Sequence, residues 1–561
     1  MEELFKRLKT YPYVTAELLA ASLFANILAL ATPLFVIQVL NRYVSHGVDA
    51  TLMTLAAGVV VAIAFELAFR QIRLNLGSAF AAPFDKANAD RVFRVLTGAR
   101  ADALAQVPPG QKREAAAGAD AVRQAYNAPS VAAYLDLPFA LVFLLALLML
   151  SAPLAAIAVL VMALVVVIGV AQARAMSGPT AELQRNGAER QGLLDSALAD
   201  PETVRAFTAQ NHLRDRWSKL GESFDAAHAK ITTRQGGAQN LTYALQALMS
   251  TAIISVGAML VVGGKLDVGL LIGANILAAR ALAPVVRMTQ LAGPLAKAKS
   301  ARQAITQILQ TPMERLEGSA LGSYSGGIEF KDLGFAYPGQ PTPLFESLNL
   351  KLGPGAVLVV SGGNGAGKTT LAKLLAGLLS PSRGQILVDG LELAQVAPEW
   401  WRRQTIYLPQ EPTFINATVR ENILAYSPDL DDAGLNKVVR DAGLEKFFAE
   451  SQLGFDMMLA NGGRNLPLGI RRRLALARAL ASGGRLVIMD EPTEGLDGEG
   501  AQQVGHVMNA LSQHGCTIIA FSHDPNVIQG APHILDLNAK PVPRLLKVES
   551  GDNSGSKGLE A

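Results

Sequence analysis

The sequence predicts a multi-domain membrane protein: an all-α domain of six membrane-spanning helices, followed by an α/β domain with a phosphate-binding loop. Three observations predict this fold. Long apolar runs fill the first half of the chain. Residues 362–369 read Gly-Gly-Asn-Gly-Ala-Gly-Lys-Thr, which fits the phosphate-loop pattern G-x-x-x-x-G-K-[ST]. Further along, the apolar run 486–489 is followed directly by Asp490 and Glu491.

The composition agrees with a chain that lies partly in lipid. Of the 561 residues, 50% are hydrophobic and 17% are charged, whereas soluble domains are about 25% charged. The formal net charge of +3 is too small to favour a nucleic-acid partner, and none is expected. The single cysteine, Cys516, excludes an intrachain disulfide and a cysteine zinc cluster. It lies in a strand-like run, so we expect it in the core.

Six apolar stretches are long enough, or nearly so, to cross a bilayer, which takes about 20 helical residues. They lie near 15–40, 51–69, 131–150, 154–172, 241–263 and 267–289. The segments 70–130 and 173–235 each hold nine Lys and Arg residues, and the short loops hold few. Because basic loops stay in the cytoplasm, this pattern predicts cytoplasmic termini and a cytoplasmic nucleotide-binding domain.

The two long basic loops are rich in alanine and poor in helix breakers, so we expect helices that extend well beyond the membrane. Pro108-Pro109-Gly110 and Asp200-Pro201 interrupt the helical pattern. They predict turns near 105–113 and 200–212.

Two features of the spans leave alternatives open. Ala29-Leu30-Ala31 fits the cleavage site of a signal peptide, but the apolar run continues to Leu40. Asn275 and Arg280 lie in the sixth span. Polar groups in a span usually face a cavity or a partner, which favours a transport path. An arginine near the membrane edge can instead extend its charge to water.

The chain divides by composition into four segments. The membrane domain takes residues 1–317, and the glycine- and serine-rich segment 318–327 is predicted to be a linker. Strand and helix patterns alternate over 328–548, and the tail 549–561 has a composition typical of disorder. The apolar strand 357–361 precedes the phosphate loop and a helix follows it, which is the context that the motif requires.

The phosphate loop and the carboxylates after the strand predict binding of ATP with Mg²⁺. Glycines let main-chain N–H groups approach phosphates, and the helix that follows adds its dipole. Lys368 is expected to reach the phosphates, and Thr369 and Asp490 to hold the metal. Glu491 is placed to polarise the attacking water. In the loop and at the start of the helix after it, the residues expected to bind ATP are Gly362, Gly363, Asn364, Gly365, Ala366, Gly367, Lys368, Thr369 and Thr370.

In its motifs the chain resembles the ABC transporter family over nearly its whole length. Tyr337, in Phe-Ala-Tyr-Pro, is similar to the aromatic residue that stacks on adenine. Gln410, in Tyr-Leu-Pro-Gln-Glu, is similar to the Q-loop glutamine, which links the metal to the membrane helices. Asp497, in Gly-Leu-Asp, resembles the D-loop aspartate. His523, in Phe-Ser-His-Asp, resembles the switch histidine, which contacts the γ-phosphate and acts beside Glu491 in catalysis.

Six spans followed by one nucleotide-binding domain resemble an exporter half-transporter, which works as a dimer. Residues 31–44, 135–140 and 279–285 are similar to the permease/ATPases of type I protein secretion systems, and 202–207 is similar to the exporters' second cytoplasmic loop. This resemblance implies export of an unfolded polypeptide across a bacterial inner membrane. The implied partners are a second half-transporter, a periplasmic adaptor, an outer-membrane duct and membrane lipid. Some members carry an N-terminal cysteine peptidase or an inactive copy, and we expect neither here.

The resemblance fails at the family signature Leu-Ser-Gly-Gly-Gln. This chain has Leu466, Pro467, Leu468, Gly469 and Ile470 there, followed by the family's arginine-rich helix. In the family this loop closes over the ATP of the opposite subunit through a serine hydroxyl and N–H groups. Proline has neither, and Leu468 adds bulk. Each lost donor costs about 3–4 kcal/mol, so we expect slow hydrolysis. A homodimer is favoured, and a heterodimer with an intact partner stays open.

Three functions fit these features. The favoured function is ATP-driven export of a protein substrate. The first alternative is export of a lipid, drug or small peptide, because the Ala-, Leu- and Val-rich spans suit either class of substrate. The second is an ATP-gated channel or regulatory subunit with little hydrolysis. The altered signature favours this reading, while the retained Glu491 and His523 oppose it.

Overall fold

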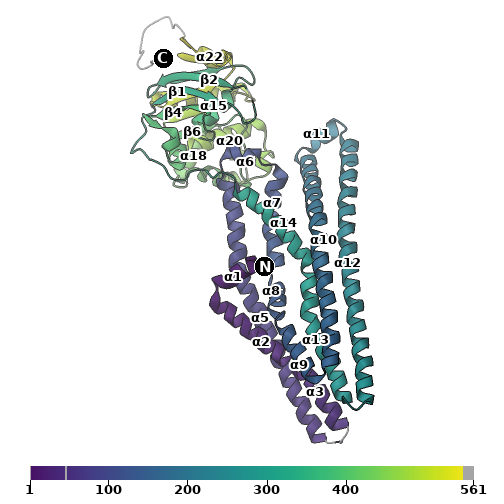
Figure 1. The fold of residues 1–561 in the computed structure, drawn as a ribbon. Coiled ribbons are helices and arrows are strands. Elements are labelled where there is room, and N and C mark those ends of the chain that lie inside the picture. Colours follow the sequence, from purple (N-terminus) through teal and green to yellow (C-terminus); the bar gives the residue numbers. More distant parts are fainter. Residues whose placement is uncertain (1, 45–46, 48, 341, 548–561) are drawn as a thin grey trace. The chain divides into compact units, whose positions relative to one another are not determined.

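The structure, a computed structural model, describes residues 2–44, 47, 49–340 and 342–547. It consists of two compact units (Figure 1). The first contains the chain up to Met313, apart from Arg100–Asp102, which group with the second unit. The second begins at Glu314. The tail 549–561, predicted to be disordered, lies outside the described residues.

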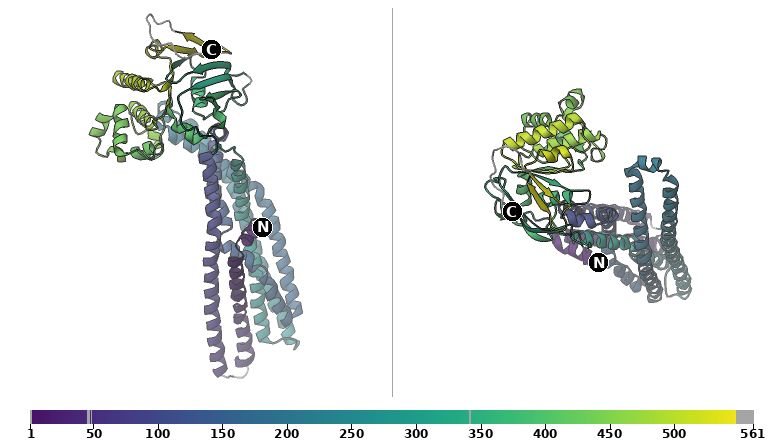
Figure 2. Two further views of the ribbon diagram at one scale, coloured as in Figure 1. Left: turned by 90° about the vertical axis from the view of Figure 1, so that its left-hand side faces the viewer. Right: turned by 90° about the horizontal axis from the view of Figure 1, so that it is seen from above.

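The first unit is built from helices alone among its described residues. They are α1 (Glu2–Thr10), α2 (Pro12–Leu28), α3 (Ala31–Gln38), the π-helical turn η1 (Val39–Tyr43), α5 (Asp49–Gly98), α6 (Ala101–Gln106), α7 (Pro109–Ala125), α8 (Ala128–Asp136), α9 (Phe139–Leu150), α10 (Ala152–Ala199), α11 (Pro201–Ala206), α12 (Gln210–Val262), α13 (Val268–Gln290) and α14 (Ala292–Leu309). Figure 2 shows the long helices running side by side as a bundle.

Six helical segments of the described chain are long and apolar enough to cross a membrane, which confirms the predicted multi-pass domain. They are Pro12–Tyr43, Asp49–Gly98, Ala128–Leu150, Ala152–Ala199, Gln210–Val262 and Val268–Leu309. Helices α5, α10 and α12 contain 50, 48 and 53 residues. A helix of this length measures about 75 Å, more than twice the hydrocarbon core of about 30 Å. The spans therefore continue beyond the bilayer, as the long basic loops predict.

The predicted turn near 200–212 falls at the short helix α11, which joins α10 to α12 (Figure 1). Asp200 caps α11, because its carboxylate accepts a hydrogen bond from Thr203 N at 3.2 Å. The other predicted turn lies between α6 and α7, where Pro109 begins α7.

A buried polar cluster ties four helices of the first unit together. Its centre is Asp136, at the end of α8, whose side chain is 2% exposed. The carboxylate contacts Arg73 Nη1 of α5 at 2.5 Å and Arg287 Nη1 of α13 at 3.2 Å. Asn26 Nδ2 of α2 donates to it at 2.9 Å. These charge-assisted contacts offset the cost of placing the carboxylate among apolar helices.

The second unit is an α/β domain with three sheets. The antiparallel sheet has the order β2 (Phe345–Leu352), β1 (Ile328–Phe335), β4 (Arg383–Val388) and β5 (Leu391–Glu392). The six-stranded sheet has the order β12 (Arg544–Lys547), β11 (His533–Asp536), β3 (Val357–Ser361), β10 (Thr517–Phe521), β9 (Leu486–Asp490) and β6 (Thr405–Leu408). Its strands are parallel except β12 at one edge. The short strands β7 (Ala417–Thr418) and β8 (Met458–Leu459) pair separately.

Helices flank these sheets. They are α15 (Lys368–Leu375), α16 (Pro398–Arg403), α17 (Val419–Leu424), α18 (Asp432–Asp441), α19 (Glu445–Glu450), α20 (Leu468–Leu480), α21 (Gly498–Gln513) and α22 (Pro525–Gln529), with the 3-10 turns η2 (Leu393–Gln395), η3 (Gly454–Asp456) and η4 (Asn461–Gly463). All five residues of β9 and of β10 are buried, as expected for strands covered on both faces. Cys516, just before β10, is 7% exposed, which confirms its place in the core.

The segment 318–327, whose composition predicts a linker, packs onto the second unit. Ser319 N donates to Gln395 O at 2.8 Å, and Ala397 N donates to Ser319 O at 3.0 Å. Tyr324 is 4% exposed and lies edge-on against Trp401, with ring centroids 5.2 Å apart. The boundary by contacts therefore falls between Met313 and Glu314. The buried aromatic side chain outweighs the flexible composition around it.

Candidate nucleotide-binding and hydrolysis site

The predicted site residues meet at one edge of the six-stranded sheet. Strands β3, β10, β9 and β6 are neighbours and run parallel, so their carboxyl ends lie together. The phosphate loop follows β3 and Gln410 follows β6. Asp490 ends β9, Glu491 comes next, and His523 follows β10. The fold thus gathers segments that are far apart in the sequence.

The phosphate loop has the conformation that its glycines permit. Gly365 and Gly367 have φ of 79° and 113°, in the left-handed region that favours glycine. Gly367 precedes α15 without a side-chain cap, so the first N–H groups of α15 are open to a phosphate. Lys368 Nζ donates to Gly362 O at 2.5 Å and lies 3.3 Å from Glu491 Oε1. The lysine charge is therefore held inside the loop.

Three oxygen-bearing side chains fit a magnesium ion. Thr369 Oγ1 donates to Gln410 Oε1 at 3.2 Å. Asp490 is 1% exposed, and neither of its carboxylate oxygens has a hydrogen-bond partner in the described part of the chain. Burial raises the pKa of this carboxyl group. A buried carboxylate without a partner is unfavourable, and carboxylate, hydroxyl and amide oxygens are the ligands that Mg²⁺ prefers. The carboxylate oxygens of Asp490, which accept no hydrogen bond of normal geometry within the described chain, are thus suited to bind a cation.

Glu491 and His523 contact each other directly. His523 Nδ1 lies 2.9 Å from Glu491 Oε1, and Glu491 is 4% exposed. Glu491 has a φ of 49°, a left-handed conformation that is unfavourable for a residue with a side chain. Such strain concentrates at functional sites. The two residues predicted to act together in catalysis thus lie in contact, and their catalytic roles remain a prediction.

Tyr337 lies beside the phosphate loop and is open to solvent. The Tyr337 hydroxyl lies 2.8 Å from Thr370 Oγ1, and its ring meets Phe335 edge-on at 4.9 Å. Tyr337 is 38% exposed, and Asn364 in the loop is also exposed. Stacking of this tyrosine on adenine remains a prediction.

The altered signature forms the start of α20. Pro467 precedes the helix, and Leu468 is its first residue and 42% exposed. Arg471 N donates the first intrahelical hydrogen bond, to Pro467 O at 3.0 Å. The N–H groups of Leu468, Gly469 and Ile470 therefore point out of the helix end. Leu466 is half-buried against the neighbouring core. Relative to the family signature, Pro467 removes a hydroxyl and its own main-chain N–H, and the N–H groups of the next three residues stay in place.

Asp497 joins two helices next to the signature. Its carboxylate caps α21 by accepting from Gly500 N at 2.8 Å, and it pairs with Arg473 Nη2 of α20 at 2.8 Å. The hydrogen bond to the Gly500 N–H is the main cause of its lowered pKa. Its D-loop role remains a prediction.

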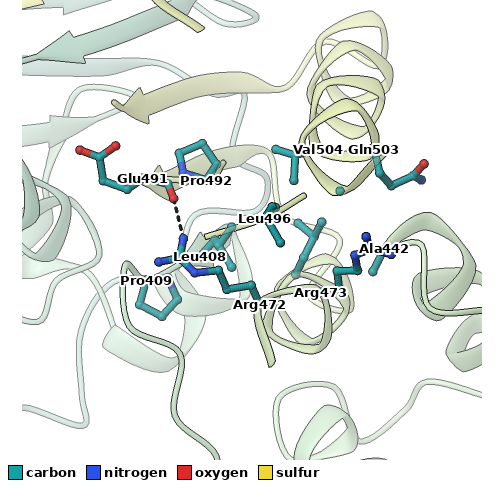
Figure 3. A pocket seen from close by; sticks show the side chains of 12 residues that line it. Leu408, Pro409, Ala442, Arg472, Arg473, Glu491, Pro492, Leu496, Gln503 and Val504 are labelled. Atoms are coloured by element: carbon teal, nitrogen blue, oxygen red, sulfur yellow. Dashed lines mark hydrogen bonds between the residues drawn. The ribbon is translucent and has the colours of Figure 1, made fainter. Parts of the chain in front are cut away.

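Four residues contact the site without having been predicted. Arg472 Nη1 donates to the main-chain oxygen of Glu491 at 3.0 Å, and Figure 3 shows that contact in the small pocket beside Pro492 and Leu496. Arg472 Nη2 donates to Glu494 Oε2 at 3.1 Å.

The other two residues contact the phosphate loop itself. Asn538 Oδ1 accepts from Gly363 N at 2.8 Å. Lys540 Nζ donates to Ala366 O at 2.9 Å. No local sequence pattern links these residues to the phosphate loop.

Asn275 and Arg280, the residues of the sixth span considered for a transport path, have partners on other helices. Asn275 Oδ1 accepts from Ser250 Oγ of α12 at 2.9 Å. Arg280 Nη1 lies 3.7 Å from Glu66 Oε1 of α5. Through these contacts the two polar side chains link α13 to its neighbouring helices. Their place on a transport path remains a prediction.

The bundle of long apolar helices and the residues gathered at the sheet edge are those of a multi-pass membrane protein with an α/β nucleotide-binding domain. Two family models match the chain. The model described as ABC transporter transmembrane region matches residues 16–285, and the model described as ABC transporter matches residues 345–494. Together they cover most of the sequence, so the chain belongs to the ABC transporter family, as an exporter that binds ATP.

Several relatives share nearly the whole chain. The exotoxin translocation ATP-binding protein PaxB of Pasteurella aerogenes, the toxin RTX-I translocation ATP-binding protein of Actinobacillus pleuropneumoniae and the leukotoxin translocation ATP-binding protein LktB of Mannheimia haemolytica are each 26% identical to it over 526 residues. The match covers 94% of this chain and 74% of each relative. The resemblance to exporters of this kind is thereby confirmed.

A solved structure confirms the fold class. It is described as a bacterial Atm1-family ABC exporter with ATP bound. The TM-score is 0.78 at 19% sequence identity, and the match covers 94% of this chain and 93% of the other. At this identity the likeness concerns the fold alone.

Proposed function

We propose that this chain exports an unfolded polypeptide across a bacterial inner membrane in a type I secretion system, driven by ATP hydrolysis. The observation that carries the proposal is the match over 94% of the chain to proteins named for toxin translocation. The similarity of residues 135–140 and 279–285 to secretion permeases agrees with it. The basic loops favour a cytoplasmic nucleotide-binding domain.

The proposed hydrolysis uses the residues gathered at the sheet edge. Thr369, Gln410 and Asp490 would hold Mg²⁺, which neutralises phosphate charge when bound. Lys368 binds the phosphates, and its charge is directed by the loop carbonyl of Gly362. Glu491 accepts the proton of the attacking water, and its carboxylate is oriented by His523 at 2.9 Å.

The proposed active form is a homodimer in which the start of α20 faces the ATP of the second copy. The three main-chain N–H groups of Leu468, Gly469 and Ile470 supply donors to the γ-phosphate, and the helix dipole adds to them. The missing serine hydroxyl slows turnover without abolishing it. The other proposed partners are a periplasmic adaptor, an outer-membrane duct and the surrounding lipid.

The experiment is translocation into sealed vesicles that contain the purified chain. A repeats-in-toxin polypeptide, kept unfolded in dilute urea, is added with Mg-ATP on the side of the nucleotide-binding domain. We expect part of it to become resistant to external protease, and Glu491→Gln to abolish this protection. ATP-driven uptake of a lipid or drug instead of the polypeptide would contradict the proposal. So would an ATP-dependent ion current without turnover.

A further inference from the structure

A continuous chain of hydrogen bonds joins the phosphate loop to the signature helix within one subunit. Thr369 Oγ1 donates to Gln410 Oε1 at 3.2 Å. Gln410 Nε2 donates to Glu494 Oε2 at 3.3 Å. The same oxygen of Glu494 accepts from Arg472 Nη2 of α20 at 3.1 Å. Glu494 thus lies between Gln410, one of the residues predicted to hold the metal, and Arg472, which is 8% exposed.

The chemistry of Glu494 decides which end of the Gln410 amide faces the site. An ionised carboxylate accepts hydrogen bonds and donates none, while an amide has one oxygen and one NH₂ group. The NH₂ group of Gln410 must therefore point at Glu494. Its oxygen then points the other way, toward Thr369 Oγ1. With the amide reversed, the NH₂ group would face a cation, which is repulsive, and two oxygens would face each other at Glu494.

Arg472 fixes the position of the Glu494 carboxylate on the side away from Gln410. Arg472 Nη1 donates to the main-chain oxygen of Glu491 at 3.0 Å while Nη2 binds Glu494 (Figure 3 shows the first contact). The two contacts use separate nitrogens of one planar guanidinium, which makes its orientation definite. The arginine thus holds the glutamate to the segment that begins with the catalytic residue.

We propose that Glu494 is a positioning residue for the metal site: it fixes the Gln410 amide with its carbonyl oxygen toward Thr369 and Mg²⁺, and Arg472 holds it there. This inference rests on the proposed metal-dependent hydrolysis and adds two residues to it. Since Arg472 belongs to α20, the same contacts connect the signature helix to the metal ligands of its own subunit. Partners behind a metal ligand commonly tune metal affinity about 10- to 100-fold.

The test measures metal binding without turnover. The full chain carrying Glu491→Gln is loaded with ATP, and Mn²⁺ is titrated as a spectroscopic substitute for Mg²⁺, with free Mn²⁺ read by electron paramagnetic resonance. We expect Glu494→Ala to weaken Mn²⁺ binding about 10-fold. Binding of a fluorescent ATP analogue in the presence of a chelator should not change. A matched control is Glu499→Ala, which removes an exposed carboxylate paired with Lys446 and should leave Mn²⁺ affinity as it was.

A double-mutant cycle separates positioning from general damage. If Glu494 acts through the amide, Gln410→Ala alone weakens Mn²⁺ binding, and adding Glu494→Ala has little further effect. Glu494→Gln, which keeps the shape and can still accept a hydrogen bond, should give an intermediate loss and serves if the alanine variant folds poorly. Unchanged Mn²⁺ affinity in Glu494→Ala, or additive losses in the double variant, would overturn the proposal. Because no hydrolysis is needed, an inactive ATPase would leave this result readable.

Discussion

At the scale of single residues, the buried carboxylate of Asp490 is predicted to lower the stability of the nucleotide-free chain. Asp490 is 1% exposed, and no hydrogen bond of normal geometry reaches its carboxylate oxygens from the described residues. We expect Asp490→Asn to stabilise the nucleotide-free chain by about 1 kcal/mol, which raises the melting midpoint by about 2–4 °C for a domain of this size. Mg-ATP should stabilise the wild type far more than the variant. Differential scanning fluorimetry with and without Mg-ATP checks this, and a lower midpoint of the nucleotide-free variant would contradict it.

The same residue gives a pH dependence with a definite sign. Burial raises the pKa of Asp490 in the folded chain above its usual value of about 3.9. The folded state is therefore penalised at neutral pH, and the penalty disappears when both states are protonated. The midpoint difference between Asp490→Asn and the wild type should shrink as the pH falls toward about 4. A difference that grows on acidification would be incompatible with this explanation.

Cys516 should react slowly in the folded chain. Burial raises the pKa of its thiol, which is 7% exposed, so little thiolate forms at neutral pH. We expect labelling by a maleimide at pH 7 to be slow, to accelerate as the pH rises, and to become rapid after unfolding. Mass spectrometry of the labelled chain gives the rate. Fast labelling at pH 7 without unfolding would show that the thiol is accessible.

At the scale of the elements, Asp136 holds α2, α5, α8 and α13 together. Removing the carboxylate leaves Arg73 buried and uncompensated, which commonly costs about 3–5 kcal/mol. We expect Asp136→Ala to lower the melting midpoint strongly in detergent. The matched control is Arg287→Ala, since the Arg287 side chain is 48% exposed and its loss still leaves Arg73 bound to Asp136. Equal midpoints for the two variants would mean that the cluster contributes little.

Local motifs predicted the elements of the site well. The strand, glycine loop and helix around Lys368 follow from adjacent residues, and Asp490 and Glu491 stand together at the end of one apolar strand. The contacts of Arg472, Asn538 and Lys540 could not be predicted in this way, because they join distant segments. The bond from Gly363 to Asn538, for example, spans 175 positions. The packing of segment 318–327, predicted to be a linker from its composition, depends on the burial of Tyr324 against the distant Trp401, which local composition does not show.

At the scale of the whole molecule, the altered signature should limit the rate of the proposed dimer. Restoring the family residues with Pro467→Ser and Leu468→Gly adds a hydroxyl and a main-chain N–H and removes bulk at the γ-phosphate. One recovered donor corresponds to about a 10²- to 10³-fold gain in kcat, with a smaller change in KM for ATP. Steady-state ATPase assays in lipid check this. No gain would show that the N–H groups at the start of α20 already suffice.

The Mg-ATPase rate of the purified chain shows whether this chain alone forms a working ATP-driven exporter. The purified chain is placed in lipid without any other subunit, and Glu491→Gln is measured beside it. We predict clear turnover that needs Mg²⁺ and that Glu491→Gln abolishes, while ATP binding persists in the variant. Binding of ATP without turnover by the wild-type chain would rule out the proposed function of this chain alone, and would point to a missing partner subunit or a non-hydrolytic role.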